Sequence, residues 1–265
     1  MAKKIIFSNS YSPRTGHNFF AEVLKVYTDA EILVHERSET RLTSLLEEYY
    51  KIYDSHIYHK TDKQFFDELF INNLRTQITS YSKQNHVIIK DTSFKGVEHI
   101  NRVFPEDIQI LLVRDPLAVL KSLFKGMALG KKDIKSKIKK ILTPIGIYPL
   151  YYAFLFNYKY SKQIPNLKDF NVIYYEKIVL KDEKTLLKLK ELFKSKKTLK
   201  NIKKEIDEIK VINSSFTKET GAEKIWDAKK KSSSFNPIKR KGHNLLIRSA
   251  LKIGSYSLRK KLGYV

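Results

Sequence analysis

The 265-residue sequence contains no cysteine, which excludes disulfide bonds, thiolate catalysis and cysteine-based zinc sites. It also has no long hydrophobic run. The longest uncharged stretch, residues 141–158, is interrupted by Pro144, Gly146 and Pro149 and is shorter than the roughly 20 residues of a spanning helix. The N-terminus leads from Lys3-Lys4 directly into the predicted first strand, so we expect no signal peptide. We therefore expect a cytoplasmic protein, with peripheral contact to an anionic membrane as a further option.

Acidic side chains are scarce in the second half of the chain. Residues 1–120 carry 15 basic and 16 acidic side chains, whereas residues 121–265 carry 36 basic and 12 acidic ones, and the whole chain has a net charge of +23. Such a positive field attracts nucleic acids, anionic membranes and anionic small molecules, and it is also typical of a solvated lysine-rich surface. No helix-turn-helix, zinc-finger or RNP signature supports specific nucleic-acid binding.

The N-terminal stretch predicts a strand, a loop and a helix. Residues 5–7 (Ile-Ile-Phe) form a short apolar run, and apolar residues recur at helical spacing from Phe19 to Tyr27. Backbone amides without a helical partner and the positive end of the helix dipole lie together at the start of such a helix, so the loop suits a phosphate. An ordinary strand–loop–helix unit without a ligand explains the same residue pattern equally well. It is not a Walker A loop, because no Gly-Lys-Ser/Thr follows. The candidate phosphate-binding residues are Arg14, Thr15, Gly16, His17 and Asn18.

Further buried strands are predicted at residues 31–36, 86–92, 108–113 and 170–176. Strands that alternate with helices predict a three-layer α/β fold with a mostly parallel central sheet. Ligands bind beyond the carboxyl ends of such strands, and four charged residues fall there: Arg14, Glu36, Lys90 and Arg114. We expect one domain over residues 1–265, with an α/β core at 1–195 and a basic helical and loop extension at 196–265.

A second motif follows the strand at residues 108–113. Arg114-Asp115-Pro116 ends this strand, and Ser122 lies eight positions after Arg114. The two motifs together resemble the sulfotransferases that use 3′-phosphoadenosine 5′-phosphosulfate (PAPS), and the pattern is closest to bacterial, protein-tyrosine and heparan-type members. The resemblance covers residues 3–125 and extends loosely to about residue 195. It implies a P-loop-like fold, PAPS as cofactor and adenosine 3′,5′-bisphosphate (PAP) as product, with no metal.

The resemblance also implies site residues. The Pro13–Gly16 loop would hold the 5′-phosphosulfate, and Arg114 and Ser122 the 3′-phosphate. His17 and Asn18 depart from the family, in which Thr or Ser is commonest at these positions.

For catalysis, Arg14 and Lys90 would supply cations, unless Lys90 instead pairs with Asp91. Glu36, 22 residues after Arg14, would be the base, with His35 as its rival and Glu39 as a third candidate.

The late part of the chain, residues 211–242, is predicted to be polar and irregular. By resemblance, a basic loop here would close over the 3′-phosphate, and Ser214 or Ser215 would contact the sulfo group; the loop candidates are Lys239, Arg240 and Lys241. Residues 244–265 form a basic amphipathic tail that either packs on the domain or lies on a membrane.

The expected reaction is sulfuryl transfer to a hydroxyl group, for which a glycan or lipid-linked acceptor is favoured. The aromatic stretch at residues 141–158 is interpreted as a core helix, with an acceptor pocket or membrane-touching face as the alternative. A P-loop-like kinase or other phosphotransferase and a basic nucleic-acid-binding protein are the alternative functions.

Overall fold

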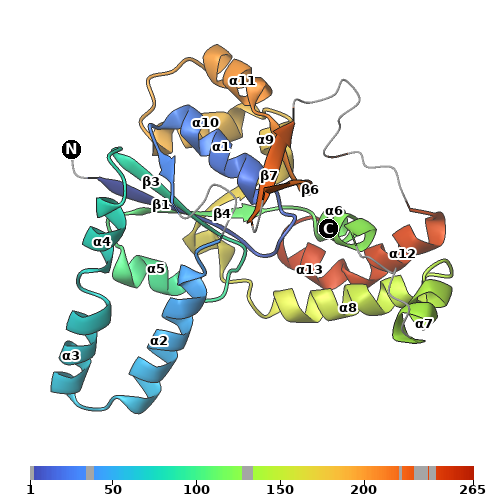
Figure 1. The fold of residues 1–265 in the computed structure, drawn as a ribbon, viewed down its shortest axis with the longest axis horizontal. Helices are drawn as coiled ribbons and strands as arrows, with labels where there is room; N and C mark the ends of the chain where they lie inside the picture. The colour runs from blue at the N-terminus through green and yellow to red at the C-terminus, as the bar shows by residue number, and fades with distance from the viewer. Residues whose placement is uncertain (1–2, 34–38, 127–133, 221–222, 230–237, 239–242) are drawn as a thin grey trace.

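Five parallel strands form the central sheet, in the order β2-β3-β1-β4-β5 (Figure 1). The computed structural model describes residues 3–33, 39–126, 134–220, 223–229, 238 and 243–265. The strands of the sheet are β1 (Lys4–Ser10), β2 (Glu31–Ile32), β3 (His86–Asp91), β4 (Ile108–Val113) and β5 (Asn171–Tyr174). The predicted α/β class with a parallel sheet is therefore confirmed.

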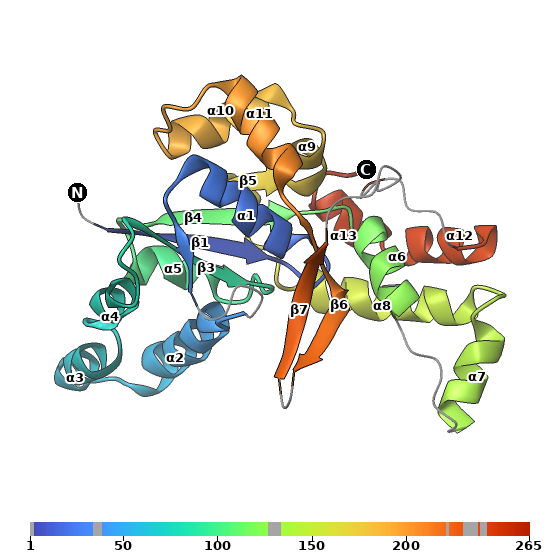
Figure 2. The ribbon, with the colours of Figure 1, turned by 45° about the horizontal axis from the view of Figure 1, so that its top comes forward.

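Helices cover both faces of the sheet and make the three predicted layers (Figure 2). One face is covered by α1 (His17–Tyr27), α9 (Tyr175–Val179), α10 (Glu183–Leu192) and α11 (Leu199–Glu208). The other face is covered by α2 (Leu42–His56), α5 (Val97–Val103), α6 (Pro116–Gly126), α8 (Ile147–Ser161), α12 (Leu245–Gly254) and α13 (Tyr256–Lys261). The remaining helices are α3 (Lys60–Phe70), α4 (Leu74–Ser80), α7 (Ile134–Leu142) and the short 3-10 helix η1 (Leu167–Asp169).

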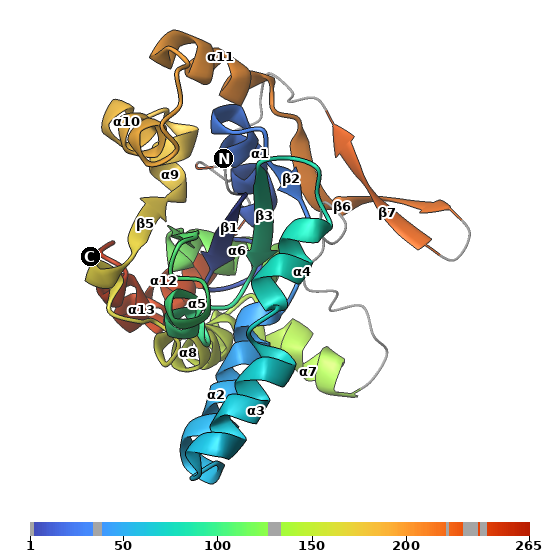
Figure 3. The same cartoon turned by 90° about the vertical axis from the view of Figure 1, so that its left-hand side faces the viewer.

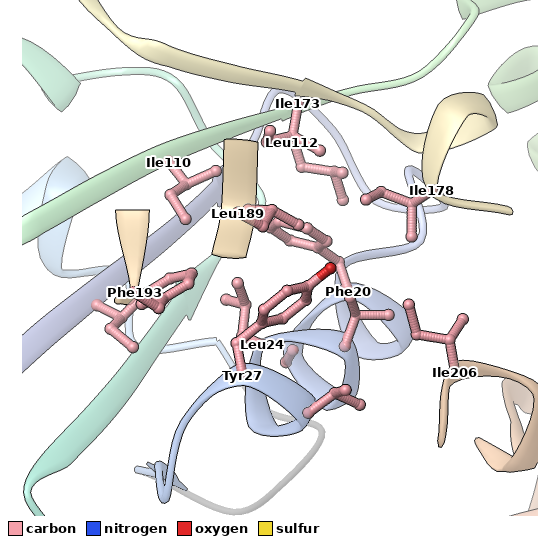
Figure 4. Close-up of a cluster of buried hydrophobic side chains, with 14 of the residues drawn as sticks. Phe20, Leu24, Tyr27, Ile110, Leu112, Ile173, Ile178, Leu189, Phe193 and Ile206 are labelled. Carbon is pink, nitrogen blue, oxygen red and sulfur yellow. The ribbon is translucent and has the colours of Figure 1, made fainter. Parts of the chain in front are cut away.

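The apolar runs of the central strands serve both faces. Successive strand residues point in opposite directions, so Ile6 packs on the α1 side while Ile5 and Phe7 pack toward α2 and α5. In the same way Ile110 and Leu112 join the cluster under α1 (Figure 4). Burial on both faces explains why these strands read as continuous rather than alternating hydrophobic runs.

The C-terminal tail packs on the domain. Ile247 and Leu251 of α12 and Leu258 of α13 are buried with Leu111 and Val113 of β4. Of the two fates expected for this tail, packing is the one observed. Within the described ranges, no helix combines the length and the apolar character needed to cross a membrane.

The structure differs from the sequence-based expectation in three places. Of the strand predicted at residues 31–36, β2 spans only Glu31–Ile32, and residues 34–36 lie outside the described residues. Residues 211–229 form an antiparallel hairpin, β6 (Val211–Thr220) and β7 (Glu223–Lys229), which stands apart from the central sheet (Figure 3). Its polar strands lack the apolar alternation by which half-buried strands are recognised. The strand predicted at residues 170–176 ends at Tyr174, because Tyr175 and Glu176 already belong to α9.

Candidate functional site

The loop between β1 and α1 leaves the carboxyl end of the central strand in a tight, unusual conformation. Both Arg14 (φ 69°) and Gly16 (φ 101°) have left-handed backbones. The Thr15 hydroxyl donates to the Ser12 carbonyl at 2.5 Å, which closes the turn from inside. Gly16 precedes the first residue of α1 and supplies no side-chain cap. No side chain therefore caps the first amides of α1. An anion that binds at a helix N-terminus needs these amides as hydrogen-bond donors.

Lys90 connects the end of β3 to this helix start. Its side chain is fully buried, and its Nζ donates to Asn18 Oδ1 at 2.8 Å. Asp91, the next residue, points to the opposite face and accepts hydrogen bonds from the Thr43 hydroxyl (2.9 Å) and the Thr92 amide (2.7 Å). Burial raises the pKa of Asp91 above its ordinary value. Lys90 and Asp91 thus contact different neighbours, and Lys90 faces the helix start.

His17, the first residue of α1, lies within the same group of charges. Its side chain is 13% exposed, and its Nε2 is 3.9 Å from Glu39 Oε1. Burial, helped by the cations of Lys90 and Arg14, lowers the pKa of His17 to about 3. His17 is therefore neutral at physiological pH. Glu39 is also paired with Arg41 at 3.0 Å.

Arg114 brings the end of β4 to the loop. It is 3% exposed, and its Nη1 donates to the Arg14 carbonyl at 3.0 Å. Its guanidinium carbon lies 4.2 Å from the centre of the Tyr175 ring, and its own carbonyl accepts from the Tyr11 hydroxyl at 2.9 Å. Ser122 lies on α6, the helix that follows Arg114. The predicted convergence of strand ends is thus seen for Lys90 and Arg114, each of which contacts the β1–α1 segment.

The Tyr175 ring packs directly on the loop. A Cβ atom at Gly16 would lie 2.3 Å from its Cε2, so only glycine fits under the ring. The ring also lies near Arg114 and near Phe19, whose ring centre is 5.9 Å away. Tyr175 was not among the predicted site residues. The available signal was an aromatic side chain directly after a strand, at the edge of the sheet where ligands bind.

A second group of contacts holds the β4–α6 junction to the C-terminus. Asp115 accepts from Arg259 Nε and from the Leu117 amide, both at 2.9 Å. Glu176 accepts from the Asp115 amide at 3.1 Å and from the Tyr264 hydroxyl at 2.6 Å. Burial and the Glu176 carboxylate raise the pKa of Tyr264 well above its ordinary range. Glu176 therefore has a structural place in the fold.

Several predicted site residues fall outside the described residues: His35, Glu36, Lys239, Arg240 and Lys241. Ser214 lies in β6, at the irregular register between Ile212 and Thr217. The chain is described again at His243, whose Nε2 is 3.1 Å from the Lys121 carbonyl, beside Ser122. The sequence did not single out His243. Among the described residues, no cluster of three or more His, Asp or Glu side chains is arranged to hold a metal ion.

Comparison with known proteins gives weak structural similarities. No family model matches the chain, and neither does any curated protein sequence. Two solved structures of retinol dehydratase are similar: one in complex with androsterone and the inactive cofactor PAP (16% identity, TM-score 0.37) and one with retinol and PAP (14% identity, TM-score 0.35). They cover 78% and 77% of this chain, which spans 64% of the retinol dehydratase chain in each case. Because both TM-scores are low, the fold class is assigned from the strand order and the parallel pairing described above, and not from these similarities.

Proposed function

We propose that this protein transfers a sulfuryl group from PAPS to a hydroxyl group of an acceptor. The observation that carries the proposal is the meeting of three strand ends at the start of α1. Lys90 from β3 hydrogen-bonds to Asn18, and Arg114 from β4 hydrogen-bonds to the backbone of Arg14. In sequence, these are the positions at which the PAPS-dependent family places its phosphate-binding and catalytic cations.

The proposed binding mode divides the nucleotide between two groups of residues. The 5′-phosphosulfate lies at the first amides of α1 and the β1–α1 loop, where the helix dipole favours an anion. The 3′-phosphate lies between Arg114 and Ser122, with the segment Lys239–Lys241 closing over it.

The proposed chemistry is an in-line displacement at sulfur. The acceptor oxygen forms a bond to sulfur, the bond from sulfur to the bridging phosphate oxygen breaks, and PAP leaves with the electron pair. Arg14 and Lys90 stabilise the charge that grows on this leaving oxygen. The acceptor proton goes to Glu36 or His35, of which we favour Glu36 because a carboxylate is ionised at neutral pH. By analogy with phosphoryl transfer, positioning and charge stabilisation supply most of the rate.

A thermal-shift titration tests the nucleotide part of the proposal. PAP at about 100 times its Kd, without metal, should stabilise the fold by about 2.7 kcal/mol and raise Tm by several degrees. Stabilisation by ATP that needs Mg²⁺ would instead favour a kinase, and salt-sensitive stabilisation by DNA or RNA a nucleic-acid binder.

The acceptor is the second part of the proposal, and we favour a glycan or a lipid-linked hydroxyl. Transfer of label from PAPS to panels of saccharides, lipids and phenols tests it. Label found only on small soluble phenols would contradict this choice of acceptor.

A further inference from the structure

Helix α7 turns its apolar side toward solvent. Ile134, Ile138 and Ile141 follow the i, i+4, i+7 spacing of one helix face and are 75%, 50% and 71% exposed. Ser136, in contrast, is buried. An amphipathic helix of a globular protein normally buries its apolar face, so this face of α7 has no partner among the described residues.

Helix α8 also exposes apolar side chains. Ile147, Tyr151 and Phe154 are each more than half exposed and repeat at i, i+4, i+7, whereas Ala153 and Phe156 are buried against the domain. The sequence-based interpretation of residues 141–158 as a core helix therefore holds for one side of α8 only. We call the exposed apolar side chains of both helices the α7–α8 surface: Ile134, Ile138, Ile141, Ile147, Tyr151 and Phe154.

The charged side chains of α7 and α8 are all positive. Residues 134–162 contain six lysines and no acidic residue. Near the α8 end, Lys162 Nζ donates to the Tyr158 hydroxyl at 2.6 Å, so this lysine lies beside the aromatic side chains. Long lysine side chains beside apolar residues can keep their charge in the lipid headgroup layer while the apolar groups enter below it.

A second exposed apolar patch, on α3, lies among residues of the opposite charge. Phe65, Leu69 and Phe70 of α3 are also more than half exposed. However, residues 42–72, which form α2 and α3, contain six acidic side chains and three lysines. Exposed apolar side chains also occur on α12 (Leu245, Leu246 and Ile253), which packs against α8 and carries the basic residues Arg248 and Lys252. The charge therefore favours the α7–α8 side of the molecule over α3 as the side that meets an anionic membrane.

We propose that the α7–α8 surface docks on an anionic lipid bilayer. The isoleucines of α7 enter the boundary between headgroups and acyl chains, and the flanking lysines contact the anionic headgroups. Helix α8 links this surface to the candidate site, because the ring of Tyr160 in α8 packs 5.9 Å from that of Tyr11 in the β1–α1 loop. Docking would hold the carboxyl edge of the sheet near the membrane (Figure 2). This proposal does not depend on sulfuryl transfer, and its test uses no nucleotide.

The first test is co-sedimentation with vesicles. Wild-type protein should sediment with phosphatidylcholine vesicles that contain about 30% phosphatidylglycerol, bind pure phosphatidylcholine much more weakly, and be released in part by high salt. The triple variant Ile134→Ser/Ile138→Ser/Ile141→Ser should bind the anionic vesicles at least about tenfold more weakly, because the inserted apolar area is lost. The matched control Phe65→Ser/Leu69→Ser removes exposed apolar groups from α3 and should bind as wild type does.

The second test reports insertion at one position. Because the chain has no cysteine, Ile138→Cys and the control Leu69→Cys can each carry a single environment-sensitive fluorophore. Anionic vesicles should shift and brighten the emission at position 138 and leave position 69 unchanged. Equal vesicle binding by the triple variant and wild type, or equal signals at both positions, would overturn the proposal. So would a wild-type dimer that fails to bind vesicles and dissociates in the triple variant, since a second copy would then be the partner of this surface.

Discussion

Replacing Gly16 by alanine tests the packing of the β1–α1 loop under Tyr175. The left-handed backbone at Gly16 (φ 101°) costs an alanine about 1–2 kcal/mol. The new Cβ would also lie 2.3 Å from the Tyr175 ring, which is 6% exposed and packed between Arg114 and Phe19. The shifts that this overpacking forces on the neighbouring groups cost about a further 1–3 kcal/mol. Gly16→Ala should therefore lower the free energy of unfolding by about 2–5 kcal/mol in urea titrations.

Two comparisons separate the backbone cost from the collision. Gly146 also has a left-handed backbone (φ 85°), but its nearest neighbour is 3.3 Å from the added Cβ. Gly146→Ala should therefore cost only about 1–2 kcal/mol. In a Tyr175→Ala background, Gly16→Ala should fall to the same cost, so the double-mutant cycle should give a coupling of about 1–3 kcal/mol. If Gly16→Ala costs the same with and without the Tyr175 ring, the packing described here is incorrect.

The remaining predictions concern three other contacts. Lys90→Met should weaken PAP binding by at least about tenfold in calorimetric titrations, because it removes a charge-assisted contact of about 1.5–3 kcal/mol. His17 takes up a proton at about pH 3 in the folded chain but near its ordinary pKa of 6.5 when unfolded, so stability should fall as pH falls through this range, by up to about 1.4 kcal/mol per pH unit. His17→Gln should show a shallower loss of unfolding free energy between pH 6.5 and pH 5. Tyr264→Phe should lower the unfolding free energy in urea by about 1–2 kcal/mol, because the Glu176 carboxylate loses a buried donor.

Each of these predictions has an outcome that contradicts it. Unchanged PAP affinity in Lys90→Met would remove Lys90 from the proposed site. If the unfolding free energy of wild type and of His17→Gln depends on pH in the same way, the pKa of His17 is not lowered in the folded chain. A Tyr264→Phe variant as stable as wild type would mean that the contact with Glu176 does not anchor the C-terminus.

The sheet could be predicted because its central strands are local apolar runs. Residues 5–7, 87–89 and 110–113 all lie in buried central strands, and their charged ends identified Lys90 and Arg114 correctly as neighbours of the first loop. This inference needs only the rule that parallel strands share one carboxyl edge. The hairpin β6–β7 could not be found in this way, because strand propensity in polar segments is decided by neighbours that the local sequence does not specify.

The details of the site depended on contacts between residues far apart in the chain. Nothing in the sequence near Gly16 indicates that Tyr175, 159 residues later, covers it. The direction of α7 is a similar case: its isoleucines have the spacing of one helix face, but this spacing does not show that Ser136 is buried and the isoleucines are exposed. Periodicity shows which residues share a face, whereas packing decides which face is covered.

The central claim is that side chains from separate strand ends meet around one nucleotide. Calorimetric titration with PAP and with adenosine 5′-monophosphate, in metal-free buffer, tests it most directly. We predict one PAP site, weaker binding of the monophosphate, loss of this preference in Ser122→Ala, and weaker binding of both nucleotides in Lys90→Met. Equal affinity of the wild-type protein for the two nucleotides, or no binding of PAP, would contradict the claim.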